Sequence, residues 1–122
     1  MTTQQVADKL VSHCKKADWD SAIKELYAPN AVSIEMPGAP NFPPRTEGVD
    51  ALMAKGDKWG SMVDTFHGVK VEGPIVAGDH FSCTFKMDIT MKGAPRMMNE
   101  EVGVYQVKDG KIVSEQFFYQ IN

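Results

Sequence analysis

The feature that most constrains the fold is a strictly alternating segment, residues 80–92, in which every second side chain is apolar. A period of two predicts a β-strand with one buried face and one polar face. The predicted buried face consists of Phe81, Cys83, Phe85, Met87, Ile89 and Met91. Hairpin turn signals lie before this segment, at Gly78-Asp79, and one strand after it, at Asp109-Gly110. The second half therefore predicts four antiparallel strands, at 65–77, 80–92, 97–108 and 111–121.

The first half of the chain predicts helices instead. Apolar residues recur at helical spacing over 6–14, 19–27 and 48–62, and Thr2 and Asp18 are good N-caps for the first two segments. A short strand is expected at 31–36, and the proline-rich stretch that follows it, up to Thr46, reads as a loop. This order is an α+β pattern. We expect a curved antiparallel sheet of four main strands plus a short N-terminal strand, wrapped around three helices as a cone with an internal pocket.

Composition excludes several classes of protein. The chain has 122 residues, which favours one domain over residues 1–122. Its net charge is -3 and it has no basic stripe, so we expect no nucleic-acid partner. No apolar run is long enough for a membrane span. Cys14 and Cys83 lie far apart, and the N-terminus lacks signal-peptide features, so we expect a cytoplasmic protein. No metal-ligand spacing or phosphate loop is present, which predicts neither metal nor cofactor.

The Asp109-Gly110 turn predicts the register of the last hairpin. If Lys108 lies opposite Lys111, then Val102 lies opposite Phe117 and Glu100 lies opposite Tyr119. The more apolar face, which we predict to be concave, then carries Met98, Glu100, Val102, Val104, Val113, Glu115, Phe117 and Tyr119. The alternative is the opposite face assignment, in which Glu101 points inward.

The strand at 65–77 needs a register shift to bury its own apolar residues. A bulge at Gly73-Pro74 supplies this shift and places Val71 beside Phe85 and His67 beside Ile89. A polar row then crosses the sheet through His67, Ile89, Glu100 and Tyr119. Strands lie about 4.8 Å apart, so a small molecule fits between His67 and Glu100 at roughly 10 Å.

Glu100 is the strongest candidate for chemistry, because desolvation on an apolar face raises the pKa of a carboxyl toward that of a general acid or base. His67 and Tyr119 would donate to a substrate oxygen. Structural roles are the alternatives: Glu100 bonded only to Tyr119 or to a helix amide, His67 as a core histidine, and Tyr119 packed by its ring. The pocket is predicted to be lined by Glu35, Glu115, Met87, Ile89, Met91, Met98, Val102, Phe117 and Trp59.

Several short motifs, in this order, resemble a known family. They are Ala22-Ile23-x-x-Leu26-Tyr27-Ala28, Ser33-Ile34-Glu35, Glu47-Gly48-Val49-Asp50-Ala51, Phe66-His67, Gly73-Pro74, Asp88-x-Thr90 and the tail from Tyr105 to Tyr119. The chain resembles a SnoaL-like domain of the nuclear-transport-factor-2-like superfamily over nearly its whole length. The resemblance implies an α+β cone. It implies no single activity, since the superfamily includes isomerases, dehydratases, cyclases and non-enzymatic binding proteins.

These observations favour a protein that binds a small hydrophobic or partly polar molecule in the cone. The leading hypothesis is a cofactor-free acid–base enzyme of the isomerase, dehydratase or cyclase type. The alternative is a non-enzymatic dimeric module whose core is filled by side chains. Met97, Tyr105 and Phe118 on the predicted outer sheet face motivate the expectation of a homodimer through that face.

Overall fold

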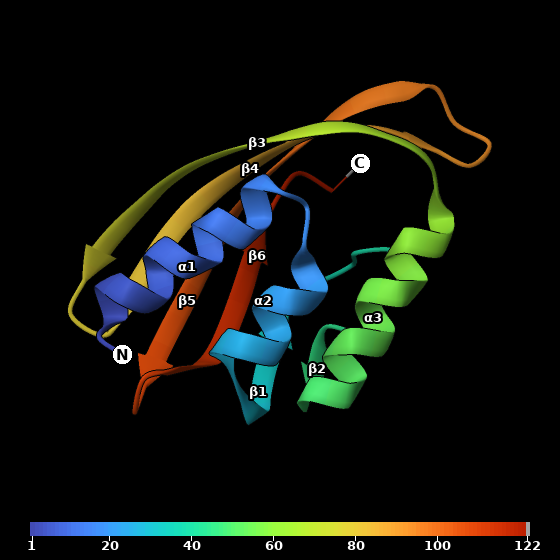
Figure 1. Ribbon diagram of the computed structural model, residues 1–122. Helices are drawn as coiled ribbons and strands as arrows, with labels where there is room; N and C mark the ends of the chain where they lie inside the picture. The colour runs from blue at the N-terminus through green and yellow to red at the C-terminus, as the bar shows by residue number, and fades with distance from the viewer. Residues whose placement is uncertain (122) are drawn as a thin grey trace.

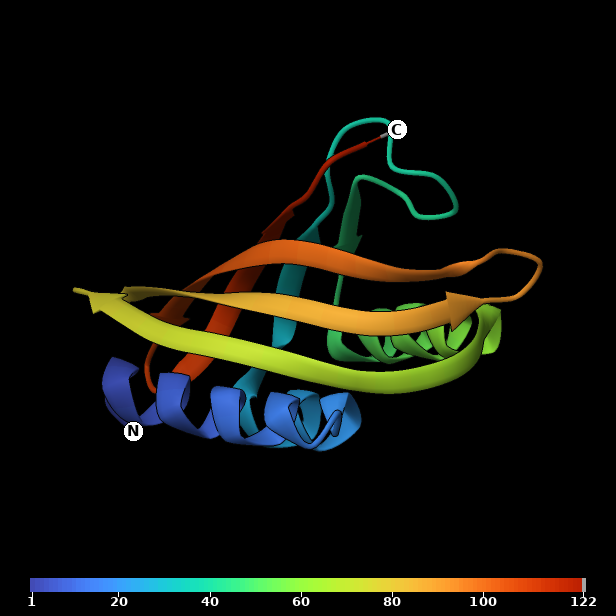
Figure 2. The ribbon, with the colours of Figure 1, turned by 90° about the horizontal axis from the view of Figure 1, so that it is seen from above.

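A computed structural model describes residues 1–121 as a curved sheet with helices on its concave side (Figures 1 and 2). Within these residues the helices are α1 (Thr3–Lys15), α2 (Trp19–Leu26) and α3 (Val49–Met62). The strands are β1 (Tyr27–Ile34), β2 (Arg45–Glu47), β3 (Val63–Ala77), β4 (His80–Met91), β5 (Arg96–Lys108) and β6 (Lys111–Phe118). They form one sheet in the order β2-β1-β6-β5-β4-β3, in which β1 is parallel to β6 and the other pairs are antiparallel.

The predicted α+β class, with three helices and a curved sheet, is confirmed. The details of the first half differ, because β1 begins at Tyr27 rather than at residue 31 and β2 forms within residues predicted as loop or helix start. Thr2 makes the predicted capping box with Gln5, and Asp18 caps α2 by accepting from the Ser21 amide. No helix within residues 1–121 has the length and apolar character that a bilayer span needs.

A β-bulge in β6 changes the register predicted for the last hairpin. Lys108 pairs with Lys111 and Val107 with Ile112, as expected, but Gln106 then pairs with Ser114, which leaves Val113 as an extra residue. A regular strand could not direct both Ile112 and Phe117 inward, because their separation is odd. The bulge allows both to face the helices. It also turns the other face of β5 inward.

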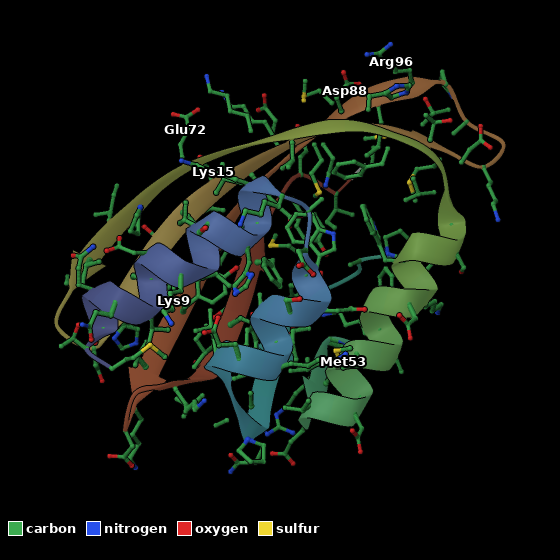
Figure 3. The ribbon with its side chains drawn as sticks, in the orientation of Figure 1. Lys9, Lys15, Met53, Glu72, Asp88 and Arg96 are labelled. Carbon is green, nitrogen blue, oxygen red and sulfur yellow. The ribbon has the colours of Figure 1, made fainter. Side chains whose placement is uncertain are left out.

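The consequence is a correction for β5. Glu100 is exposed and lies opposite Lys86 on the outer face, whereas Glu101 pairs with the buried Phe85 and points inward. Met98 and Val102, predicted inside, are 54% and 38% exposed on the outer face. The outer side of the sheet is visible in Figure 3, where labelled Glu72, Asp88 and Arg96 project away from the helices.

The inward face of β4 is as predicted, with Phe81, Phe85 and Ile89 all at most 5% exposed. In β3 the predicted bulge at Gly73-Pro74 is present, and Val71 pairs with Phe85.

Two further bulges in β3, at Asp64 and at His67, were not predicted. Phe66 pairs with Ile89 and Gly68 with Asp88, so His67 is the extra residue. His67 is exposed and its Nε2 bonds Thr90 Oγ1 at 2.8 Å, so the predicted polar row does not form.

The homodimer stays a prediction, but the residues that motivated it need correction. Tyr105 is only 2% exposed on the concave side, and Met97 also faces inward, while Phe118 is 43% exposed on the outer face as expected. The apolar residues exposed on the outer face include Ile75, Met98, Val102 and Phe118.

Gly103 allows the ring of Tyr105 to lie against the backbone of its own strand. A Cβ at Gly103 would lie 2.8 Å from Cε1 of Tyr105 and 3.1 Å from Cε2 of Phe85. We expect Gly103→Ala to lower the free energy of unfolding by about 1–3 kcal/mol, because the ring must move within a packed core. Urea unfolding measures this, with Gly68→Ala as control, since nothing lies within 4 Å of a Cβ there. Equal losses in the two variants would contradict the prediction.

Candidate functional site

A cavity of about 400 Å³ lies between the concave face of the sheet and the helices. Its wall is mainly apolar and includes Trp19, Ile23, Leu52, Trp59, Met62, Phe85, Met87, Ile89, Met91, Met97 and Phe117. Residues 39–42, in the loop between β1 and β2, also line it. Polar side chains reach it from α3, from β1, β5 and β6, and from the residues that directly follow β1 and β6. They include Tyr27, Glu35, Lys55, Asn99, Glu101, Tyr105, Glu115 and Tyr119.

The residues predicted for the site divide into two groups. The structure places one group on the cavity wall: Glu35, Trp59, Met87, Ile89, Met91, Glu115, Phe117 and Tyr119. The other group lies on the far side of the sheet or outside the cavity: His67, Met98, Glu100 and Val102. The two bulges, at Val113 and His67, account for this division.

Lys55 organises the polar end of the cavity. It lies on the same face of α3 as Leu52 and Trp59, and its side chain is 16% exposed. Its Nζ donates to Ser33 Oγ at 2.9 Å and to a carboxylate oxygen of Glu35. Two of the three ammonium donors are therefore used within the protein, and Nζ also lies 5.8 Å from the centre of the Phe117 ring.

Glu35 is held from a second side by Tyr119. The Tyr119 hydroxyl donates to Glu35 Oε1 at 2.6 Å. Desolvation, this hydrogen bond and the Glu35 charge together raise the pKa of Tyr119 well above its ordinary value. Tyr119 is thus a neutral donor at every ordinary pH. Glu100, which was predicted to lie opposite Tyr119 in the sheet, is not its hydrogen-bond partner.

Glu115 completes a buried set of polar contacts. The parallel pairing of β1 with β6 places Ser33 opposite Glu115, and the Tyr27 hydroxyl donates to the Glu115 carboxyl. Burial raises the pKa of Glu115, and hydrogen bonds from Tyr27 and Ser33 partly offset this effect. Six side chains are therefore connected by hydrogen bonds in one series: Tyr119, Glu35, Lys55, Ser33, Glu115 and Tyr27.

Glu101 differs from the other two carboxyls of the cavity, because its only hydrogen bond within residues 1–121 is a long one, 3.4 Å from Asn99 Nδ2. Desolvation raises the pKa of Glu101 to about 7, and the charge of Glu35 adds to this rise, while Asn99 and Lys55 oppose it. A carboxyl with this pKa exchanges a proton readily near neutral pH. Glu101 is therefore the group best placed for proton transfer.

Sequence reasoning missed Lys55, Tyr27 and Asn99, and it kept Glu101 only as the alternative to Glu100. A signal for Lys55 was present, since positions 52, 55, 56 and 59 form one helical stripe in which only Lys55 is charged. Among residues 1–121, no group of three or more His, Cys, Asp or Glu side chains is arranged to hold a metal ion.

The arrangement defines a class of protein: an α+β cone whose cavity carries an inward-facing carboxyl, Glu101, and a lysine that Ser33 and Glu35 hold in place. The sequence model of the SnoaL-like domain family matches residues 1–119, so the chain belongs to this family. The comparison with curated protein sequences finds no match.

Solved structures share the fold. A protein of Mesorhizobium loti named as a candidate SnoaL-like polyketide cyclase is 36% identical, has a TM-score of 0.90, and the match covers 98% of this chain and 100% of that one. An NTF2-like protein of unknown function from Burkholderia pseudomallei has 13% identity and a TM-score of 0.82, over 98% and 92% of the chains. TerC, co-crystallised with polyporic acid, has 11% identity and a TM-score of 0.81, over 97% and 91%.

Proposed function

We propose that this protein is a cofactor-independent acid–base enzyme that moves a proton on a small, largely apolar carbonyl compound, as isomerases, dehydratases and cyclases do. The observation that carries the proposal is Glu101: an inward-facing carboxyl in an apolar cavity, with a pKa of about 7 and no ion-pair partner among residues 1–121. A general base works best when its pKa lies near the working pH, because it is then ionised yet still basic.

The roles follow from the contacts. The Glu101 carboxylate takes a proton from the carbon next to the substrate carbonyl, and the C–H electron pair moves into an enolate. The third ammonium N–H of Lys55, which Ser33 and Glu35 leave unused, donates to the enolate oxygen. Protonated Glu101 then returns the proton to another carbon in an isomerisation or to a departing hydroxyl in a dehydration.

Tyr119 has a positioning role in this scheme, since its hydroxyl proton is directed at Glu35. Glu35 in turn fixes the Lys55 ammonium. His67 and Glu100 have no part in it, because they lie outside the cavity.

The relatives support a cavity that receives a small organic molecule. TerC was crystallised with polyporic acid, and a protein of Catenulispora acidiphila with a ketosteroid isomerase-like fold was solved in complex with trimethylamine. A volume of about 400 Å³ is typical of small-molecule sites. This open space speaks against the alternative of a module with a filled core.

The test is exchange of the protons next to the carbonyl of 2-heptanone in D₂O, followed by NMR. We expect the wild-type protein to accelerate exchange and Glu101→Gln to slow it at least about 100-fold, because the amide cannot accept the proton. Glu100→Gln is the matched control, since it makes the same change one residue away on the outer face and should leave the rate unchanged. An unaccelerated wild type, or equal rates in the two variants, would overturn the proposal.

A further inference from the structure

A groove follows the seam between α2 and α3, which lie next to each other beneath the sheet (Figure 1). It is lined by Ala17, Asp18, Trp19, Asp20, Gly56, Asp57 and Gly60. Trp19 and Gly56 also line the large cavity. The wall between the cavity and the groove therefore consists of the Trp19 indole ring and the backbone of Gly56, which has no side chain.

Neither packing nor backbone conformation explains glycine at this place in α3. A Cβ at Gly56 or at Gly60 would meet nothing within 4 Å, and neither glycine has a positive φ. Glycine inside a helix is unfavourable compared with almost any other residue. The two glycines are four residues apart and thus share one face of the helix. Their structural effect is to keep that face open.

The wall formed by Trp19 and Gly56 lies close to the proposed reacting groups. The Trp19 ring packs edge-on against Phe85, with ring centres 6.5 Å apart, and Phe85 is the cross-strand partner of Glu101. Trp19 and Glu101 thus both neighbour Phe85 on the cavity wall. Lys55 directly precedes Gly56 on α3. A ligand with its carbonyl at Lys55 and Glu101 thus lies next to the wall that Trp19 and Gly56 form.

We propose that the cavity continues into the seam groove and that Gly56 determines how long a ligand the protein accepts. The ligand class is a carbonyl compound with an unbranched apolar chain, which passes between Gly56 and Trp19 and ends in the groove. Asp18, Asp20 and Asp57 surround that end, so an uncharged terminus is favoured over a carboxylate. The position of the carbonyl rests on the proposed function, but the path of the chain is tested by binding alone.

The experiment is calorimetric titration with 2-alkanones of increasing length, from 2-hexanone to 2-tetradecanone. For the wild-type protein we expect Kd to fall about fourfold for each added methylene, since each one buries a further CH₂. In Gly56→Leu the fall should stop at a shorter chain, because the leucine side chain fills the opening. Tryptophan fluorescence gives a second readout, as both tryptophans of the chain, Trp19 and Trp59, line the cavity.

Gly60→Leu is the matched control. It places the same good helix former one turn further along, where it lines the groove but not the cavity, and should weaken only the longest ketones. Chain-length dependence identical in Gly56→Leu and wild type would overturn the proposal, as would a wild type that binds no member of the series. Normal chain-length dependence together with unimpaired proton exchange in Glu101→Gln would instead overturn only the proposed reaction.

Discussion

Replacing Lys55 by methionine is expected to lower the free energy of unfolding by about 3–5 kcal/mol, the usual cost of removing one partner from a buried ion pair. The Lys55 and Glu35 side chains are only 16% and 10% exposed, and within residues 1–121 Lys55 is the one cationic side chain that lines the cavity. Without it, the charges of Glu35 and of any ionised Glu115 lose their compensation. Urea unfolding at neutral pH measures the effect.

Two further variants separate the lost charge from lost packing. Lys58→Met makes the same substitution at an exposed position of α3, where the ammonium contacts only Asn41 O and the Phe42 ring, and should change stability by less than about 1 kcal/mol. The double variant Lys55→Met/Glu35→Leu removes both charges and should recover much of the lost stability. A Lys55→Met protein as stable as Lys58→Met would show that the pair contributes little.

Lys55→Met is also expected to change the pKa of Glu101. The Lys55 charge lowers the pKa of Glu101, so its removal should raise that pKa above about 7. The pH profile of proton exchange should then move to higher pH. A profile that stays in place would contradict this effect of the Lys55 charge on Glu101.

The sequence was sufficient to predict the inward face of β4, because all its apolar residues fall on one side of the alternation. It also predicted the register shift at Gly73-Pro74, because proline cannot donate a ladder hydrogen bond and glycine tolerates the φ of +113° found there. The helix caps at Thr2 and Asp18 were predictable for a similar reason, since capping depends on local side-chain chemistry.

The face of β5 was not predictable in this way. Val102 and Val104 lie on one face, and Tyr105 and Val107 lie on the other, so alternation does not distinguish the two. The bulge at Val113 determines which face of β5 points inward, and no glycine or proline in the sequence indicates this bulge. Only the packing of Ile112 and Phe117 against the helices requires it. This single residue exchanges Glu100 for Glu101 in the cavity.

The predicted inward position of His67 was wrong for a similar reason, because an unmarked bulge changes the register there. β3 is 15 residues long, and a strand of that length follows the curvature of the sheet more easily with a second bulge. The bulge at His67 directs Phe66 toward Trp59 of α3, with ring centres 6.5 Å apart, and leaves the imidazole outside. Tertiary contact with a helix distant in sequence decides this position.

The stability of the protein is expected to fall as pH rises from about 5 to about 7, while its activity rises over the same range. The pKa of Glu101 is raised in the folded state from 4.5 to about 7, so in this range the native protein holds a proton that the unfolded chain releases. The free energy of unfolding then decreases with pH, by an amount on the order of 3 kcal/mol for the whole shift, and levels off above it. Glu115, whose pKa is also raised, acts in the same direction.

Urea unfolding of the wild-type protein and of Glu101→Gln at pH 5 and pH 8 isolates the contribution of Glu101. The two proteins should have similar stability at pH 5, where Glu101 is protonated and resembles glutamine in charge. At pH 8 Glu101→Gln should be the more stable protein, because the wild type then carries a desolvated charge. Glu100→Gln should follow the wild type at both pH values, since Glu100 is exposed. Equal pH dependence in Glu101→Gln and wild type would contradict the assignment.

The two effects of Glu101→Gln have one physical cause. The desolvation that makes the ionised carboxyl costly to keep in the cavity also makes it basic enough to remove a proton from carbon. A variant that is more stable at pH 8 and has lost proton exchange is the pattern expected when stability is given up for activity at a functional site. A carboxyl with only a structural role would show the opposite sign, since its replacement would remove favourable contacts and lower stability at pH 8.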